Sequence, residues 1–101
     1  DLMWVNPWYS NFDPQYIYAF LRFYDDERLL IVANFNINES RNCNVKIPID
    51  ALHLMNLEQD EICREAVDIF TNEIMTYTLQ TIDTQGILIN LNPADIKIIK
   101  L

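Results

Sequence analysis

Residues 16–35, YIYAFLRFYDDERLLIVANF, decide the fold that the sequence predicts. Two apolar runs, 16–24 and 28–35, are rich in aromatic and aliphatic residues and contain neither Gly nor Pro, which is typical of strands. Residues 25–27 (DDE) separate the runs; three adjacent acids require water, and Asp tolerates turn geometry. The stretch therefore predicts a β-hairpin with a short, solvent-facing loop.

Neither face of this predicted hairpin is polar. Because successive side chains of a strand point to opposite faces, the faces of the first strand are Ile17, Ala19, Leu21 and Phe23 against Tyr16, Tyr18, Phe20, Arg22 and Tyr24. In the second strand they are Leu29, Ile31, Ala33 and Phe35 against Leu30, Val32 and Asn34. An antiparallel strand with one wet face should alternate apolar and polar residues. We therefore expect apolar cover on both faces, one from the rest of the chain and the other from a partner.

The hairpin resembles a segment of a known enzyme family. YAFLR at 18–22, followed by DERLLIVANF at 26–35, is similar to the opening hairpin of the C-terminal β-domain in α-amylase-type (family 13-like) glycoside hydrolases. The later strands agree with that domain in order and pattern more than in letters. The resemblance implies an antiparallel Greek-key β-sandwich packed against a catalytic (β/α)8 barrel, and a parent enzyme that hydrolyses or transfers at α-glucosidic bonds.

The remaining sequence predicts about seven short strands and at most one helical turn, which is typical of an all-β sandwich. We expect a one-sided strand through Val45, Ile47 and Ile49, then a short helical turn capped by Asp50. Gly86 closes a turn where a positive φ is needed. Three further strands are expected: 62–70, with Cys63, Val67 and Ile69 inward; 74–82, with Met75, Tyr77 and Leu79 inward; and 87–91, followed by a last strand over 95–101.

The N-terminal residues 1–15 are interpreted as a linker from the catalytic barrel, and residues 16–101 as the β-sandwich domain. The linker is rich in aromatic residues and has no regular period. If it packs between the two domains, its aromatic side chains are buried there; the alternative is a platform on which sugar rings stack. The residues expected in interdomain packing or sugar stacking are Trp4, Trp8, Tyr9, Tyr16, Tyr18 and Phe20.

The composition describes one globular domain with an adequate core, since half of its 101 residues are hydrophobic. Fifteen acids against seven bases give a net charge of −8, and no Lys/Arg cluster occurs, which argues against nucleic acid and membrane surfaces as partners. No apolar stretch predicts a membrane span or a signal peptide, and the absence of Met at position 1 indicates an excised piece. The compartment stays open.

The search for catalytic and metal-binding chemistry finds none. The family's catalytic carboxylates lie on barrel strands outside this chain, and the acids present here are expected in solvated turns. His53 is the only histidine, with no recognisable partner to orient it. Metal-ligand spacings and Gly-rich phosphate loops are absent, so no cofactor is expected. Cys43 and Cys63 are interpreted as two buried thiols, a disulfide being the alternative.

Three hypotheses follow. In the first, the chain is a non-catalytic accessory domain that covers and stabilises the barrel of an α-amylase-like enzyme. In the second, it is a carbohydrate-binding module for starch-like α-glucans, using Trp4, Trp8 and Tyr9. In the third, the apolar hairpin face pairs with another protein or with itself, so that the isolated domain self-associates.

Overall fold

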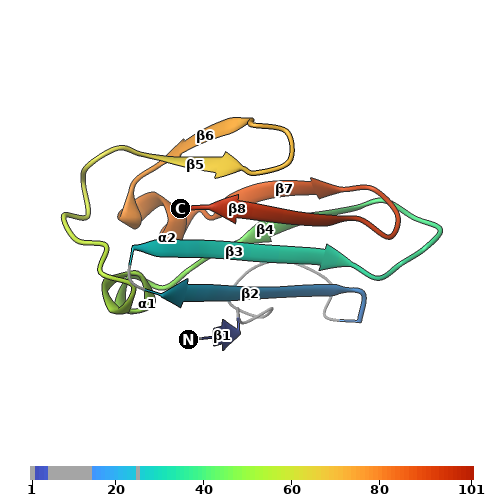
Figure 1. Cartoon of the computed structure of the whole chain (residues 1–101), viewed down its shortest axis with the longest axis horizontal. Helices are drawn as coiled ribbons and strands as arrows, with labels where there is room; N and C mark the ends of the chain where they lie inside the picture. Colours follow the sequence, from blue (N-terminus) through green and yellow to red (C-terminus); the bar gives the residue numbers. More distant parts are fainter. Residues whose placement is uncertain (1, 5–14, 25) are drawn as a thin grey trace.

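The fold is all-β and consists of two antiparallel sheets. The computed structural model describes residues 2–4, 15–24 and 26–101. The large sheet has the order β1-β2-β3-β8-β5-β6, and the small sheet pairs β4 with β7 (Figure 1). The strands are β1 Leu2–Trp4, β2 Ile17–Tyr24, β3 Glu27–Asn34, β4 Arg41–Val45, β5 Arg64–Asp68, β6 Ile74–Tyr77, β7 Ile87–Leu91 and β8 Ile96–Lys100. The all-β class is confirmed; the Greek-key connectivity stays a prediction.

The predicted hairpin is confirmed as β2 and β3. The two strands pair over their whole length, from Ile17 opposite Asn34 to Tyr24 opposite Glu27. The predicted parity is also correct, because Leu21 and Leu30 lie opposite each other and are fully buried. This side of the large sheet, which we call the inner face, packs against the rest of the chain.

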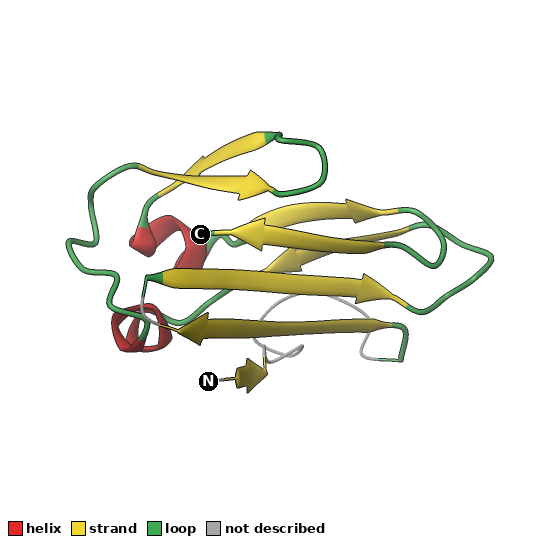
Figure 2. Cartoon of the chain, in the orientation of Figure 1, coloured by secondary structure: helices red, strands yellow, loops and turns green. Residues whose placement is uncertain are grey.

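The core lies between the inner face and the small sheet, with the two helices closing one end (Figure 2). Alternation along β7 supplies three of its residues, since Leu88 and Asn90 are exposed between buried neighbours. The largest fully buried side chains are Leu21, Leu30, Ile47, Leu52, Met55, Leu79, Ile82, Leu91, Ile99, Val32, Val45 and Asn34.

The two helices are α1, Ile49–Leu54, and α2, Leu79–Thr84. The prediction of at most one helical turn and of a strand over 74–82 was therefore wrong, because β6 ends at Tyr77 and α2 follows. The Thr78 hydroxyl accepts a hydrogen bond from the Thr81 backbone N–H at 3.1 Å, and the Thr81 hydroxyl accepts one from the Thr78 N–H at 2.9 Å. This capping box starts a helix where apolar alternation alone predicts a strand.

The N-cap predicted for α1 was also wrong. Pro48 occupies the cap without a side-chain hydrogen bond, and Asp50 lies in the first turn of the helix. A proline there needs no backbone hydrogen-bond partner, since it has no N–H. The strand predicted through Val45, Ile47 and Ile49 lies earlier, as β4 over Arg41–Val45, which pairs with β7.

The inward residues predicted for 62–70 were wrong. Ala66 and Asp68 point inward, whereas Cys63 and Ile69 are exposed and Val67 lies on the opposite side of β5. The reversal has a polar cause: the buried Asp68 carboxylate accepts a hydrogen bond from the Phe70 backbone N–H at 2.9 Å and so caps the turn after β5. An inward-facing carboxylate breaks the apolar alternation on which the prediction depended.

The N-terminal segment is more regular than predicted. Leu2–Trp4 form the edge strand β1, with Met3 opposite Leu21 and Trp4 opposite Phe20 in β2. An irregular linker over 1–15 is therefore the wrong description for these three residues. The boundary between linker and domain stays a prediction.

The turn at Gly86 is as predicted. Its φ is +81°, and a Cβ at this position would lie 2.0 Å from the Asn44 Oδ1 and 2.8 Å from the Val45 carbonyl oxygen. Both the backbone conformation and the close approach of β4 therefore require glycine.

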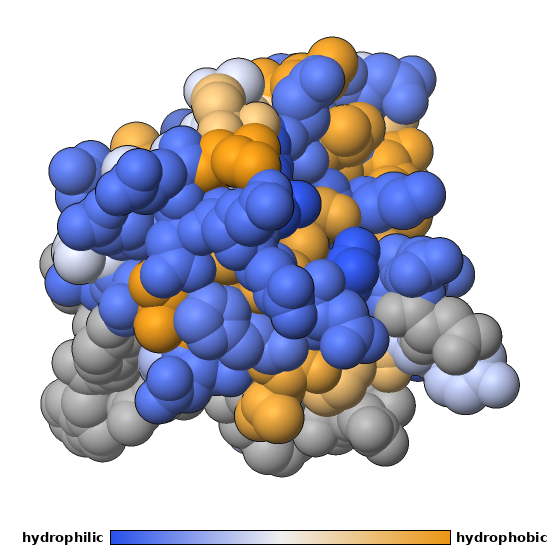
Figure 3. Space-filling view, turned by 90° about the vertical axis from the view of Figure 1, so that its left-hand side faces the viewer, coloured by the Kyte–Doolittle hydropathy of each residue, from blue (hydrophilic) through white to orange (hydrophobic). Residues whose placement is uncertain are grey.

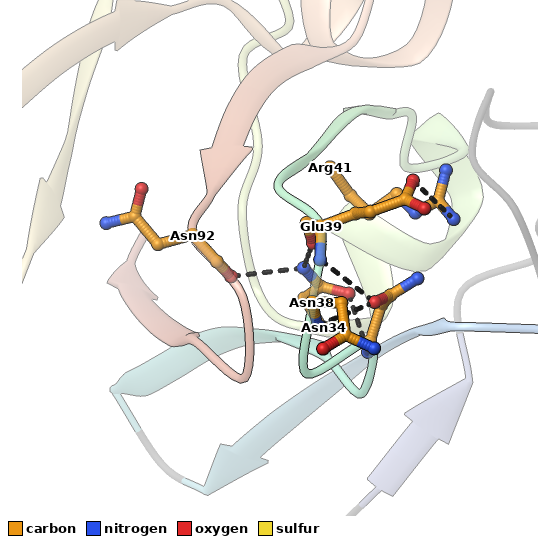
Figure 4. Close-up of polar contacts among 6 residues, drawn as sticks. Asn34, Asn38, Glu39, Arg41 and Asn92 are labelled. Carbon is orange, nitrogen blue, oxygen red and sulfur yellow. Dashed lines mark hydrogen bonds and ion pairs between the residues drawn. The ribbon is translucent and has the colours of Figure 1, made fainter.

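A buried asparagine, Asn34, stabilises the end of the sandwich opposite the helices (Figure 4). The Asn34 side-chain amide donates hydrogen bonds to the backbone carbonyls of Glu39 and Asn92, both at 3.0 Å. Its Oδ1 accepts from the Asn36 backbone N–H at 3.0 Å. One side chain thus joins the end of β3, the loop before β4 and the turn between β7 and β8.

Candidate functional site

The candidate functional site is the face of the large sheet that points away from the small sheet, which we call the outer face. Strand parity places on it alternate residues of five neighbouring strands. Most of them are aliphatic or aromatic. The outer face consists of Tyr18, Phe20, Arg22, Leu29, Ile31, Ala33, Val67, Ile69, Ile74, Ile96, Ile98 and Lys100, with Tyr24, Glu27, Glu65 and Thr76 at the end near the helices.

The register aligns these residues in rows across the strands. One row consists of Tyr18, Ala33 and Ile96 on β2, β3 and β8. The next row consists of Phe20, Ile31 and Ile98 on the same strands. A third crosses all five strands as Arg22, Leu29, Lys100, Val67 and Ile74.

Several of these apolar side chains are open to solvent. Tyr18 is 49% exposed, Ile96 47% and Ile74 59%, although each lies in a regular strand. The patch continues beyond the sheet, because the ring of Phe35 meets that of Tyr18 edge to face, with 5.3 Å between centroids. Contiguous apolar surface of this kind is typical of a protein–protein interface.

The predicted site residues lie in different parts of the structure. Tyr18 and Phe20 lie on the outer face, as expected. Tyr16 lies just before β2, where the Arg41 guanidinium sits over its ring, 4.8 Å from the centroid. Trp4 lies in β1, opposite Phe20 in the backbone register. Trp8 and Tyr9 lie outside the described residues.

Sequence reasoning did not assign the contributions of β5, β6 and β8 to this face. Ile96 and Ile98 share a parity in the run IKII at 96–99, and this signal could have been used. Val67 was missed because it was expected to point inward. These residues become one surface only when β8 pairs with both β3 and β5.

The acidic loop after α1, residues 56–62, forms a polar cluster with His53. The His53 Nε2 lies 2.8 Å from the Asp60 Oδ1, so this histidine does have the orienting partner that the sequence did not reveal. Both side chains are more than 40% exposed and line a shallow, open hollow with Glu58, Gln59 and Glu61. Figure 3 views this end of the molecule, and hydrophilic residues cover most of its middle. The loop is therefore a solvated end, as predicted for its acids.

The loop is held in place by arginines. The Arg28 side chain donates hydrogen bonds to the backbone carbonyls of Met55 and Asn56, and the Arg64 guanidinium donates to that of Glu58. Among the described residues no three His, Cys, Asp or Glu side chains gather closely enough to hold a metal ion. Nor does any helix of the described chain have the length and apolar character to cross a bilayer.

The two cysteines differ. Both are free thiols; Cys43 is buried in β4, whereas Cys63 is exposed, so the prediction of two buried thiols was wrong for Cys63. Burial raises the pKa of the Cys43 thiol from its ordinary 9.0 to about 11, against a smaller opposite effect of the Lys97 ammonium. A thiol with such a raised pKa is a poor nucleophile.

Comparison with known proteins does not identify a relative. No known family model matches the chain, and no curated protein matches it significantly.

Proposed function

We propose that this chain is a non-catalytic accessory domain of an α-amylase-like glycoside hydrolase or glucanotransferase, and that its outer face packs on the catalytic (β/α)8 barrel and stabilises it. The single observation that carries the proposal is the contrast between the two faces of the large sheet. The inner face is covered by the small sheet and the helices. The outer face is also apolar, yet Ile74 and Ile96, at the starts of β6 and β8, are exposed, and Ile31 and Ile98 in the middle of paired strands stay partly exposed.

The resemblance of the hairpin supplies the occupant. In α-amylase-type enzymes a C-terminal β-domain packs on the barrel, and the outer side of such a barrel is a ring of helices. An apolar sheet face packs readily against helices, since this is one of the few stable ways of layering secondary structure. Packing of this kind buries the outer face and stabilises both partners.

The test uses two isoleucine-sized side chains on opposite sides of the domain. Ile96 on the outer face and Leu88 on β7 are both exposed strand residues, at 47% and 63%. In the complete protein that contains this chain, Ile96→Cys and Leu88→Cys are made separately in a Cys63→Ser background. Each is treated with N-ethylmaleimide, and alkylation is followed by mass spectrometry of the peptide that contains the new thiol.

We expect Cys at position 96 to react at least about tenfold more slowly than Cys at position 88, because a packed interface excludes the reagent as well as water. Equal rates at the two positions would refute the docking of the outer face.

A further inference from the structure

Two cations of the outer face form no hydrogen bond or ion pair among the residues that the structure describes. Arg22 and Lys100 lie in the same row, on either side of Leu29, two strands apart. At the usual strand spacing this separates their Cα atoms by roughly 10 Å. Both side chains are exposed.

The other basic residues lie elsewhere, and four of them interact within the chain. Arg28 and Arg64 bind backbone carbonyls of the acidic loop, and Arg41 pairs with the Glu39 carboxylate at 3.5 Å. Lys46 interacts within the chain, and Lys97 lies near the Cys43 thiol. A chain with a net charge of −8 therefore places on its apolar outer face two cations that have no partner among the described residues.

The nearest acids of this face lie outside the apolar rows. Glu27 and Glu65 occupy the next register position toward the end with the helices, where they pair with Tyr24 and Thr76 in the backbone. Neither forms an ion pair with Arg22 or Lys100. Within this row, Leu29 is thus flanked by two cations that have no partner among the described residues.

The next step rests on the proposed function. We propose that the barrel surface that packs on the outer face is apolar and carries at least one carboxylate opposite Leu29. This carboxylate binds Arg22 and Lys100. The long stems of both side chains can lie along apolar surface while their charged ends reach the carboxylate. Such pairs fix the register of two apolar surfaces that would otherwise slide, and they make attachment sensitive to salt.

A second copy of this chain is a poorer occupant. Two copies that meet face to face are related by a twofold axis in the plane of contact. An axis along the strands would bring the Arg22 and Lys100 row of one copy against the same cations of the other. An axis across the strands through the row of Phe20, Ile31 and Ile98 would lay those cations over the row of Tyr18, Ala33 and Ile96, which has no carboxylate. Neither of these arrangements neutralises them, and an axis shifted so that the cations meet Glu27 would leave the rows of Tyr18 and Phe20 uncovered.

The test uses the complete protein with Ile96→Cys as the reporter in the Cys63→Ser background. Arg22→Gln and Lys100→Gln are introduced together into this parent. The matched control is Asn42→Asp with Gln80→Glu, which changes the net charge by the same amount at exposed positions off the large sheet. Alkylation of the reporter is measured at low salt and in about 1 M NaCl, where the Debye length falls to roughly 3 Å.

At low salt we expect the double Gln variant to be alkylated about two- to tenfold faster than its parent, as the loss of two partly exposed ion pairs implies. High salt should raise the rate of the parent toward that of the variant, and the control should match the parent. If Cys at position 96 is alkylated slowly in the parent, and neither the double Gln variant nor salt changes that rate, the proposed carboxylate is refuted while the docking of the outer face stands. An unprotected reporter in the parent would overturn both.

Discussion

Leu29 and Leu30 are neighbours on β3 and differ in the face of the sheet that they occupy. Leu30 is fully buried against Leu21 and Ile99, whereas Leu29 lies on the outer face between Arg22 and Lys100 and stays partly exposed. The same residue type therefore serves the core on one side and an open surface on the other. Both faces of this sheet are therefore rich in apolar residues, and the described chain covers one of them.

The largest expected effect is the difference in stability between substitutions of these two leucines. Leu30→Ala is expected to lower the free energy of unfolding of this chain by about 3 kcal/mol, because it removes buried methyl groups and leaves a cavity. Leu29→Ala should cost about 1 kcal/mol or less, as is usual for a side chain with little to lose in burial. Urea denaturation of both variants measures the difference. Equal losses would mean that the outer face is already covered within the chain.

The next effect concerns the buried amide that joins the two sheets. Asn34→Ala should lower the free energy of unfolding by about 2 kcal/mol, since it leaves two carbonyls and one N–H without their side-chain partner. Asn42→Ala, at an exposed position of β4, is the matched control and should change stability by less than about 0.5 kcal/mol. If thermal melts of the two variants coincide, Asn34 does not hold this end of the sandwich.

A smaller effect on the free energy of unfolding should appear at alkaline pH, through the buried Cys43 thiol. The pKa of Cys43 is raised from 9.0 to about 11 in the folded chain, so between these values the unfolded thiol loses its proton while the folded one keeps it. The unfolded state then binds fewer protons, and stability should fall as pH rises from about 9 to about 11. Cys43→Ala should reduce this slope in urea titrations at several pH values. A slope identical to that of the parent would exclude the thiol as its cause.

The smallest change in stability belongs to the exposed outer residues. Ile74→Thr and Ile96→Thr together should alter the free energy of unfolding of this chain by less than about 0.5 kcal/mol per site. They should nevertheless reduce self-association in light scattering, because they interrupt the apolar patch. Leu88→Thr, exposed on β7, provides the control. Unchanged scattering would show that the outer face does not drive association.

The sequence could predict much of this comparison. Two apolar runs without Gly or Pro, separated by an acidic break, were enough to predict β2, β3 and the faces of each, since side-chain parity depends only on position along a strand. The prediction failed where a polar side chain changed the local geometry. Thr78 and Thr81 begin a helix within an apolar run, and Asp68 turns inward to cap a turn.

The sequence by itself determined that both faces of the first hairpin are apolar and that Gly86 closes a turn. Only the tertiary structure decided that β8 lies between β3 and β5, which brings Lys100 into one row with Arg22. The reason is physical: alternation along one strand is a local property, whereas the neighbour of a strand depends on which distant segments pair. The pairing of β8 therefore defines the outer face as one continuous surface.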